Sequence, residues 1–224
     1  MNGRLVNGTA MNERWATFDC YGTLIDWNRG IRGVLGRVFG EARVDAELLR
    51  FHDIEPALQA DGRRTYREVL TEAMRRLGAR QSEVAALAES LPGWPAFPEV
   101  RRALEDARAS GWRLAILSNT DRDYIEASIR QIGVPFDLAI VASEIGSYKP
   151  ATTHWTEFVR RTGADPTGHV HVAASLFHDI APAASLALRA VWINRLGEQS
   201  SLPRVRELPD LTGLPVVLSA LEGA

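Results

Sequence analysis

The sequence predicts an α/β protein, in which a parallel sheet core is flanked by helices and carries an inserted α-helical cap domain. Short β-rich runs recur along the chain and are separated by segments of helical periodicity, which is the rhythm of a parallel βαβ sheet. Between the first run and the second lies a long stretch without a convincing strand. The sequence therefore predicts one sheet domain interrupted by a helical insertion.

The predicted elements follow one another in a simple order. The predicted strands are 15–18, 114–117, 138–141, 169–172 and 191–193. Within the insertion, apolar side chains at i, i+3, i+4 and i+7 predict a helix over 66–77. The Pro- and Gly-rich stretch 91–98 predicts the return to the sheet. We therefore expect a core domain of residues 1–28 and 98–224 and a cap domain of residues 29–97.

Composition places the chain among globular proteins with a small-molecule partner. With 224 residues, 46% of them hydrophobic and 24% charged, it can bury a full core. A net charge of −2 gives no electrostatic reason to expect nucleic acid or an anionic membrane. The single cysteine excludes an internal disulfide, and no apolar run approaches the ~18 residues of a membrane helix. We expect a cytoplasmic location.

One carboxylate stands out at the end of the first predicted strand. Asp19 follows an apolar strand and precedes a tight turn, so it emerges at the edge where open parallel sheets bind ligands. Gly22 leaves the turn without a side chain, and the Thr23 hydroxyl and backbone N–H groups can point back at the anion. This arrangement predicts a nucleophile. An aspartate that only caps a strand-to-turn connection is the alternative.

Polar side chains also follow three later strands, at the ends that should meet at the same sheet edge. Ser118 and Asn119 end the second strand, Lys149 follows the third, and Ser175 and Asp179 follow the fourth. A lysine beside a carboxylate favours its ionised form. Asp179 could pair with this lysine and help to position water. The alternatives are helix capping for the hydroxyl, amide and acid groups and a solvated surface position for the lysine.

These four pieces resemble the haloacid dehalogenase superfamily, whose motifs occur in the same order: Asp-x-x-Gly-Thr, a strand ending in Ser-Asn, a Lys-Pro and a late acidic loop. The resemblance spans residues 13 to 220 and implies a Rossmann-like core with a helical cap. Phosphatases of this family carry a second aspartate two residues after the nucleophile and an acid five residues before the late aspartate, which completes a Mg²⁺ shell. Here Tyr21 and Ala174 occupy those positions. The chain therefore resembles the type II 2-haloacid dehalogenase branch, which uses neither metal nor organic cofactor.

The resemblance implies a hydrolytic dehalogenase acting on 2-haloalkanoic acids through an aspartyl ester, and His178 extends the expected substrates to fluoroacetate. Asp19 attacks the carbon that carries the halogen, and water then hydrolyses the ester to a 2-hydroxy acid. Ser118 and the backbone N–H groups around Cys20 and Tyr21 are expected to hold the substrate carboxylate. Asn119 and a cap arginine are expected to hold the departing halide. Arg50 is the best match to that arginine, although several other arginines lie in the insertion.

Other positions depart from the branch and define further expectations. Leu176 stands where the branch carries an asparagine that positions water, so Asp179, Lys149 or Ser175 is expected to hold water instead. His178 stands where a bulky aromatic residue is usual, and its hydrogen-bonding ring would favour small halides such as fluoride. Trp155, where tyrosine is common, is expected to line the pocket or to pack its helix.

Two other activities remain open at this level. A phosphatase would need Mg²⁺, and a related C–N hydrolase could use the same nucleophile to open a strained-ring amino acid. The branch resemblance suggests a homodimer.

Overall fold

The computed structural model describes residues 13–60 and 62–221, so residues 1–12 of the predicted core domain lie outside the described part of the chain. Its centre is a six-stranded parallel sheet with strand order β3-β2-β1-β4-β5-β6. The strands are β1 Trp15–Phe18, β2 Arg113–Ser118, β3 Leu138–Val141, β4 His169–Ala173, β5 Arg189–Ile193 and β6 Arg206–Leu208. The order places β1 in the interior of the sheet, between β2 and β4. The predicted α/β class is confirmed.

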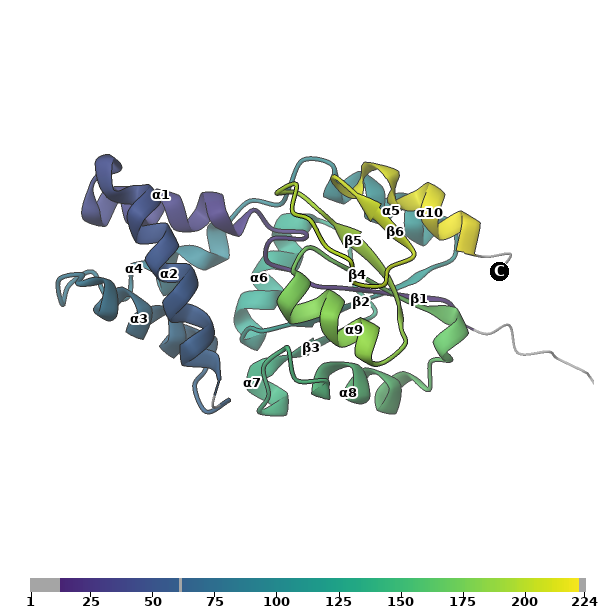
Figure 1. Cartoon of the computed structure of the whole chain (residues 1–224). Coiled ribbons are helices and arrows are strands. Elements are labelled where there is room, and N and C mark those ends of the chain that lie inside the picture. Colours follow the sequence, from purple (N-terminus) through teal and green to yellow (C-terminus); the bar gives the residue numbers. More distant parts are fainter. Residues whose placement is uncertain (1–12, 61, 222–224) are drawn as a thin grey trace, which may run out of the picture.

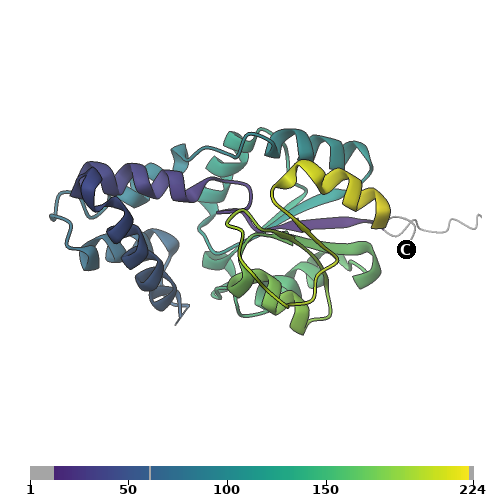
Figure 2. The ribbon, with the colours of Figure 1, turned by 45° about the horizontal axis from the view of Figure 1, so that its top comes forward.

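Helices cover both faces of this sheet (Figures 1 and 2). Alternate side chains of each strand point to opposite faces. Phe18 packs in one cluster with Leu104 of α5, whereas Trp15 packs in another with Phe158 of α8. The first face is covered by α5 Val100–Ala109, α6 Arg122–Ile132 and α10 Leu214–Ala220, and the second by α8 Thr153–Thr162 and α9 Ala181–Ser185.

Short helical turns connect these elements. They are η1 Glu41–Arg43, η2 Leu91–Gly93, α7 Ala142–Ile145, η3 Pro166–Gly168, η5 Leu211–Gly213 and a π-helical turn, η4 Leu176–Ile180.

The insertion between β1 and β2 is helical, as predicted, and forms a separate lobe beside the sheet (Figure 1). Its helices are α1 Trp27–Phe39, α2 Val44–Gln59, α3 Tyr66–Leu77 and α4 Ala86–Ser90. Helix α3 has the predicted bounds, and a capping box between Thr65 and Glu68 fixes its start. Its apolar stripe is buried. The boundaries of the cap domain at residues 29 and 97 stay a prediction.

Asp121 joins the cap to the core. It stands at the N-cap position of α6, but its carboxylate does not bind that helix. Its two oxygens instead accept from the backbone N–H groups of Tyr66 (2.8 Å) and Arg67 (2.9 Å), at the start of α3. A carboxylate from one domain therefore caps a helix of the other.

We expect Asp121→Ala to lower the free energy of unfolding by about 1–2 kcal/mol, because the buried backbone N–H of Tyr66 and the part-buried one of Arg67 lose their acceptor. Urea titration followed by circular dichroism measures the change. Asp123→Ala, which removes an exposed ion pair to Arg67, is the matched control and should cost less than about 1 kcal/mol. Equal losses in the two variants would contradict the capping role.

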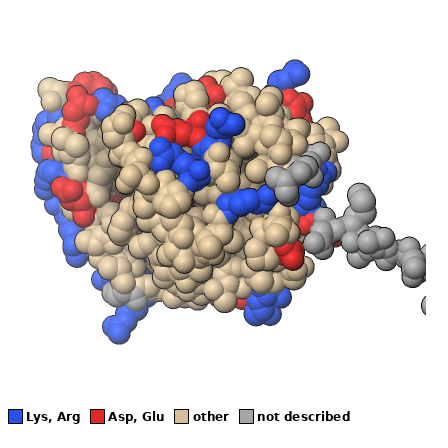
Figure 3. Space-filling view, turned by 45° about the vertical axis from the view of Figure 1, so that its right-hand side comes forward, with Lys and Arg blue, Asp and Glu red and all other residues tan. Residues whose placement is uncertain are grey.

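The surface agrees with the modest net charge. On the face drawn in Figure 3, basic and acidic side chains are interspersed rather than gathered into one basic field. Within the described ranges, every helix is too short or too polar to cross a bilayer.

Candidate active site

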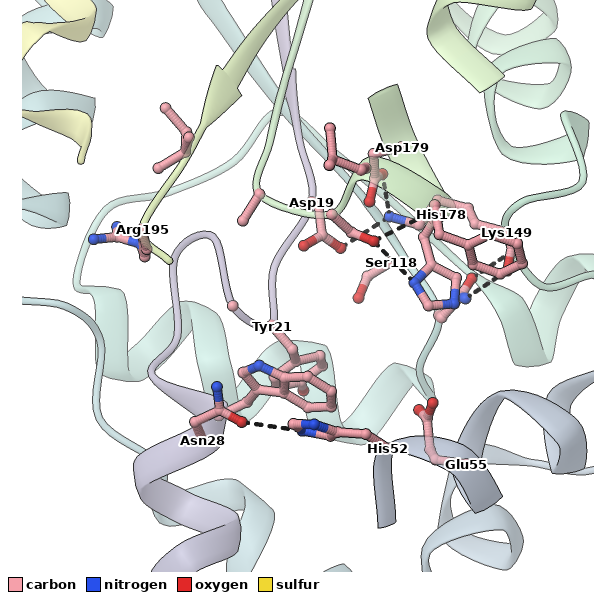
Figure 4. Close-up of a pocket in the computed structure, with 18 of the residues that line it drawn as sticks. Asp19, Tyr21, Asn28, His52, Glu55, Ser118, Lys149, His178, Asp179 and Arg195 are labelled. Atoms are coloured by element: carbon pink, nitrogen blue, oxygen red, sulfur yellow. Dashed lines mark hydrogen bonds and ion pairs between the residues drawn. The ribbon is translucent and has the colours of Figure 1, made fainter. Parts of the chain in front are cut away.

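A pocket of about 630 Å³ lies where the carboxyl end of the sheet faces the cap. Asp19 reaches it directly after β1, and its backbone N–H is held by Val172 O of β4 at 3.1 Å. Figure 4 shows Asp19, Lys149 and Asp179 together on the sheet side, with His52 and Glu55 on the cap helix across the cavity. The predicted convergence of strand ends is therefore present in the structure.

The turn after Asp19 holds its carboxylate in place. Gly22 adopts a φ of +89°, which an L side chain would take only with strain, and Trp27 would lie 3.2 Å from an added Cβ. The Thr23 hydroxyl donates to Asp19 Oδ2 at 2.8 Å and accepts from the Ala174 backbone N–H at 2.9 Å. Thr23 thus ties the Asp19 carboxylate to the loop after β4.

Lys149 binds acceptors from three different strand ends. Its ammonium donates to Asp19 Oδ1 at 2.8 Å, to Asp179 Oδ1 at 2.7 Å and to the Leu117 carbonyl at 2.8 Å. The lysine side chain is almost fully buried. All three ammonium protons are therefore used, which fixes both carboxylates relative to each other.

Asp19, Asp179 and Lys149 shift one another's pKa values. Burial raises the pKa of Asp19, an effect that Lys149 opposes and the Asp179 charge reinforces. Burial acts in the same way on Asp179, but Lys149 and His171 outweigh it and hold the pKa of Asp179 below its usual range. The two carboxylates keep the pKa of Lys149 above its usual value despite burial. Asp179 is thus firmly anionic, and the positive charge of Lys149 favours the ionised form of Asp19.

A buried polar chain supports Asp179 from behind. His171 Nε2 lies 3.0 Å from Asp179 Oδ1 and donates to it, because an ionised carboxylate only accepts. The Thr17 hydroxyl lies 2.9 Å from His171 Nδ1 and 2.8 Å from His169 Nε2. Among the described residues, Asp179 Oδ2 has no partner although it is buried. One oxygen of Asp179 is therefore held rigidly, and the other is available to a water molecule or a substrate.

The buried histidines predict a pH-dependent stability. Burial lowers the pKa of His154 and of His169 to about 3, against about 6.5 in an unfolded chain. At these two positions the unfolded chain therefore binds more protons between pH 3 and pH 6.5, so the stability that the neutral histidines contribute is complete above pH 6.5 and falls as the pH drops below it. From pH 6.5 to pH 5 each histidine should cost roughly 2 kcal/mol. Urea unfolding at pH 7.5 and pH 5 measures this loss, which should be smaller in His169→Gln. A pH dependence in His169→Gln that equals that of the wild type would contradict the expectation. The comparison of the two proteins cancels the opposite contribution of Glu55, whose pKa burial raises to about 7.

Ser118 and Asn119, at the end of β2, differ in whether their polar atoms already have hydrogen-bond partners. Ser118 Oγ is buried at the pocket wall without a hydrogen-bond partner among the described residues, so it can donate to a ligand. The Asn119 amide nitrogen donates to Gln59 Oε1 at 3.1 Å and to Lys149 O at 3.0 Å, and its oxygen accepts from the Lys149 backbone N–H. Asn119 therefore links the core to the cap with both N–H groups in use.

Tyr21 and Cys20 follow the nucleophile but face different surroundings. The Tyr21 hydroxyl lies 3.0 Å from Ser128 Oγ, and burial raises its pKa well above the usual range. The Cys20 thiol is buried, and burial raises its pKa as well. Tyr21 lines the pocket, whereas the Cys20 side chain packs in the core.

The loop after β4 forms another wall. The Ser175 hydroxyl accepts from the His178 backbone N–H at 3.0 Å and lies 3.1 Å from His178 Nδ1. Burial lowers the pKa of His178, so its ring is neutral at physiological pH. Ser175, Leu176 and His178 all line the pocket.

Two predicted binding residues lie outside the pocket wall. Arg50 is half-exposed on the cap, where its guanidinium binds Glu47 at 2.7 Å and the Arg76 carbonyl at 3.3 Å. Trp155 is buried beneath the sheet, with its ring centroid 5.1 Å from that of His171. The structure thus does not bring Arg50 to Asp19, and Trp155 packs its helix, which is the second of its two expected roles.

The cap contributes polar groups that sequence reasoning missed. His52, Glu55 and Gln59 of α2 line the pocket, as do Asn28 of α1 and Tyr66 of α3. The spacing 52, 55, 59 places three polar residues on one helical face, and this was the available signal. Arg195, after β5, also lines the pocket, where it pairs with Glu99 at 2.7 Å.

The sequence model of the haloacid dehalogenase-like hydrolases matches residues 14–186, which include every element of the site described above apart from Arg195. The chain belongs to this family of hydrolases. The expected resemblance is therefore confirmed, including its direction toward the 2-haloacid dehalogenases.

Individual relatives of this haloacid dehalogenase-like hydrolase support the assignment. (S)-2-haloacid dehalogenase 1 of Pseudomonas sp. (strain CBS-3) is 27% identical over 222 residues, which cover 93% of this chain and 97% of that protein. (S)-2-haloacid dehalogenase 4A of Burkholderia cepacia is 26% identical over 195 residues, 82% and 84% of the two chains. The structure of L-2-haloacid dehalogenase from Xanthobacter autotrophicus with chloropropionic acid covalently bound superposes with a TM-score of 0.78 at 19% identity, covering 92% of this chain and 98% of that one, and shows the same fold.

Proposed function

We propose that this hydrolase is a 2-haloacid dehalogenase that works through an aspartyl ester. The observation that carries the proposal is the placement of Asp19 in the pocket, held by Lys149 and Thr23. The Tyr21 hydroxyl, at the position where a phosphatase of this family carries its second acid, is bound to Ser128 instead. The site thus has a nucleophile and its counter-ion but no acid to protonate an alcohol leaving group at that position.

The first step is displacement at saturated carbon. A carboxylate oxygen of Asp19 forms a bond to the carbon that carries the halogen, and the halide leaves with the electrons of the broken carbon–halogen bond. The unpartnered Ser118 hydroxyl is the group best placed to hold the substrate carboxylate. Lys149 keeps Asp19 anionic for this attack.

The second step is hydrolysis of the ester. Water attacks the carbonyl carbon of the Asp19 ester, the acyl C–O bond breaks, and the 2-hydroxy acid leaves with one water proton while the other passes to solvent. Asp179 Oδ2, buried and without a partner among the described residues, supports a role in accepting a hydrogen bond from this water. Asp179 would then take over the role of the asparagine that the dehalogenase branch carries at the position of Leu176.

Halide release tests the proposal. We expect the protein to release chloride from 2-chloropropionate, and fluoride from fluoroacetate, in the presence of EDTA. Turnover of p-nitrophenyl phosphate that requires Mg²⁺, without halide release, would favour a phosphatase instead. Ring opening of a strained cyclic amino acid, again without halide release, would favour the C–N hydrolase. The homodimer and the cytoplasmic location stay predictions.

His178 is expected to favour small halides, because its ring can donate a hydrogen bond to a compact fluoride. His178→Phe should lower the ratio of fluoride to chloride release by roughly fivefold, the value of one lost hydrogen bond. Ion chromatography of matched fluoro- and chloroacetate reactions measures this ratio. Leu176→Met, a change in the same wall that removes no donor, is the control, and an unchanged ratio in His178→Phe would exclude the role.

A further inference from the structure

The pocket is larger than the proposed chemistry requires. About 630 Å³ lies within the range of cavities that enclose drug-sized ligands, whereas a two- or three-carbon haloacid would occupy only its sheet side. The remaining volume is bounded by α1 and α2 of the cap, from which Asn28, His52 and Glu55 project (Figure 4). These side chains would therefore contact the part of a substrate that extends away from Asp19.

Glu55 is the acidic group of this wall. Glu55 is only 5% exposed, and its carboxyl group accepts hydrogen bonds from the Gln59 amide and from the Tyr66 hydroxyl. None of the ion pairs among the described residues includes Glu55. A buried carboxyl without a counter-ion is costly to ionise, and burial raises its pKa to about 7. A cation beside this carboxyl group would stabilise its ionised form.

The neighbouring wall also offers acceptors. His52 Nε2 lies 3.2 Å from Asn28 Oδ1 and donates to it, because that amide oxygen only accepts. Burial lowers the pKa of His52, so its Nδ1 is a bare acceptor. The ring stacks on Trp27 at 5.3 Å, which holds it in this orientation. The cap side of the pocket thus presents a carboxyl group and an imidazole nitrogen to the ligand.

The charged residues that line the cavity also favour a cationic ligand group, because acidic side chains outnumber basic ones. Its acidic lining residues are Asp19, Asp26, Glu55, Asp179 and Glu198, and its basic ones are Lys149 and Arg195. Lys149 is shared by two of these acids, and Arg195 is paired with Glu99. A substrate whose only charge is a carboxylate gains nothing at the cap end of such a pocket, whereas a second, positive group does.

We propose that the cap side of the pocket binds an ammonium group at the far end of the substrate, with Glu55 as its counter-ion and His52 as a further acceptor. The substrate would then be an amino-bearing acid whose carboxylate and leaving group lie at Ser118 and Asp19. This assignment rests on the proposed function for the sheet side of the pocket and adds the chemical class of the substrate tail.

Stable product analogues test the proposal without turnover. Isothermal titration calorimetry compares 4-amino-2-hydroxybutanoate with 2-hydroxybutanoate, which differ only in the terminal ammonium. The wild type should bind the amino compound about tenfold more tightly or better, the value of one charge-assisted hydrogen bond. Glu55→Gln, which keeps shape and hydrogen bonding, should abolish this preference, and Glu55→Asp should retain part of it.

Glu47→Gln is the matched control, because Glu47 is a buried acid of the same helix that pairs with Arg43 and Arg50 instead. It should keep the preference for the amino compound. Equal affinities in the wild type, a preference that survives in Glu55→Gln, or binding of neither compound would each overturn the proposal.

The two proposals fail separately. If the amino compound binds selectively but no 2-haloacid releases halide, the dehalogenase function falls and the cation site stands. If 2-chloropropionate is dehalogenated and no preference for the ammonium exists, only the cation site falls.

Discussion

Asp19→Asn is expected to abolish halide release, by about 10³-fold or more, because the amide oxygen is a poor nucleophile and the ester can no longer form. The substitution keeps the shape of the side chain, so Thr23 still finds an oxygen to which it can donate. Burial disfavours the charge of Asp19, so its removal should leave the protein folded. Circular dichroism verifies the fold, and chloride release from 2-chloropropionate measures the loss.

Isotope labelling tests directly whether an ester forms at Asp19. In single turnovers in ¹⁸O water, the label should enter the Asp19 carboxylate, because water attacks the ester carbonyl rather than the substrate carbon. Mass spectrometry of the peptide that contains Asp19 detects it. Label found only in the 2-hydroxy acid would mean that water itself displaces the halide, and the ester mechanism would be wrong.

Lys149→Met is expected to damage both activity and stability. Without the ammonium, the carboxylates of Asp19 and Asp179 remain buried near each other with no shared cation, and such an uncompensated arrangement typically costs 3–5 kcal/mol. Asp19 would also become protonated more readily and so lose its nucleophilic form. We expect halide release to fall about 10³-fold or more and the urea midpoint to fall with it.

A second substitution separates the two effects. Lys149→Met with Asp179→Asn removes one of the stranded charges, so the double variant should recover part of the lost unfolding free energy while it stays inactive. Additive losses in unfolding free energy would show that Lys149 and Asp179 do not act as a unit. Arg101→Met, which breaks an exposed ion pair with Glu105, is the control and should change stability by less than about 1 kcal/mol.

Much of the sheet could be predicted because its strands are buried runs with clear boundaries. The predicted 15–18 and 138–141 match β1 and β3 to the residue, and the other three predicted strands fall within β2, β4 and β5. Strand β6, Arg206–Leu208, was missed, since its exposed charged residues at the sheet edge give no apolar run. Parallel strand ends share one edge, so the meeting of Asp19, Lys149 and Asp179 followed from order alone.

The cap wall could not be predicted in the same way. Distance along the sequence favoured Arg50, but successive helical residues are rotated by about 100°, so Arg50 and His52 point to opposite sides of α2. Only the packing of α2 against α1 and α3 decides which side faces Asp19. The Asp121 contact was hidden for a similar reason, because an aspartate that precedes a helix is ordinarily read as its own cap.

The lysine that joins three strand ends has a consequence for how the active state arises. Its acceptors are the Asp19 carboxylate directly after β1, the Leu117 carbonyl near the end of β2 and the Asp179 carboxylate on η4, the turn that follows β4. A one-residue slip of one of these strands against its neighbour would displace its acceptor by about 3.3 Å along the strand, out of hydrogen-bonding distance of the ammonium. The three acceptors therefore meet at Lys149 only when two pairings, β1 with β2 and β1 with β4, are in register. Compact but misaligned forms of the chain would be chemically inert, so recovered turnover after denaturation reports correct alignment of the middle of the sheet.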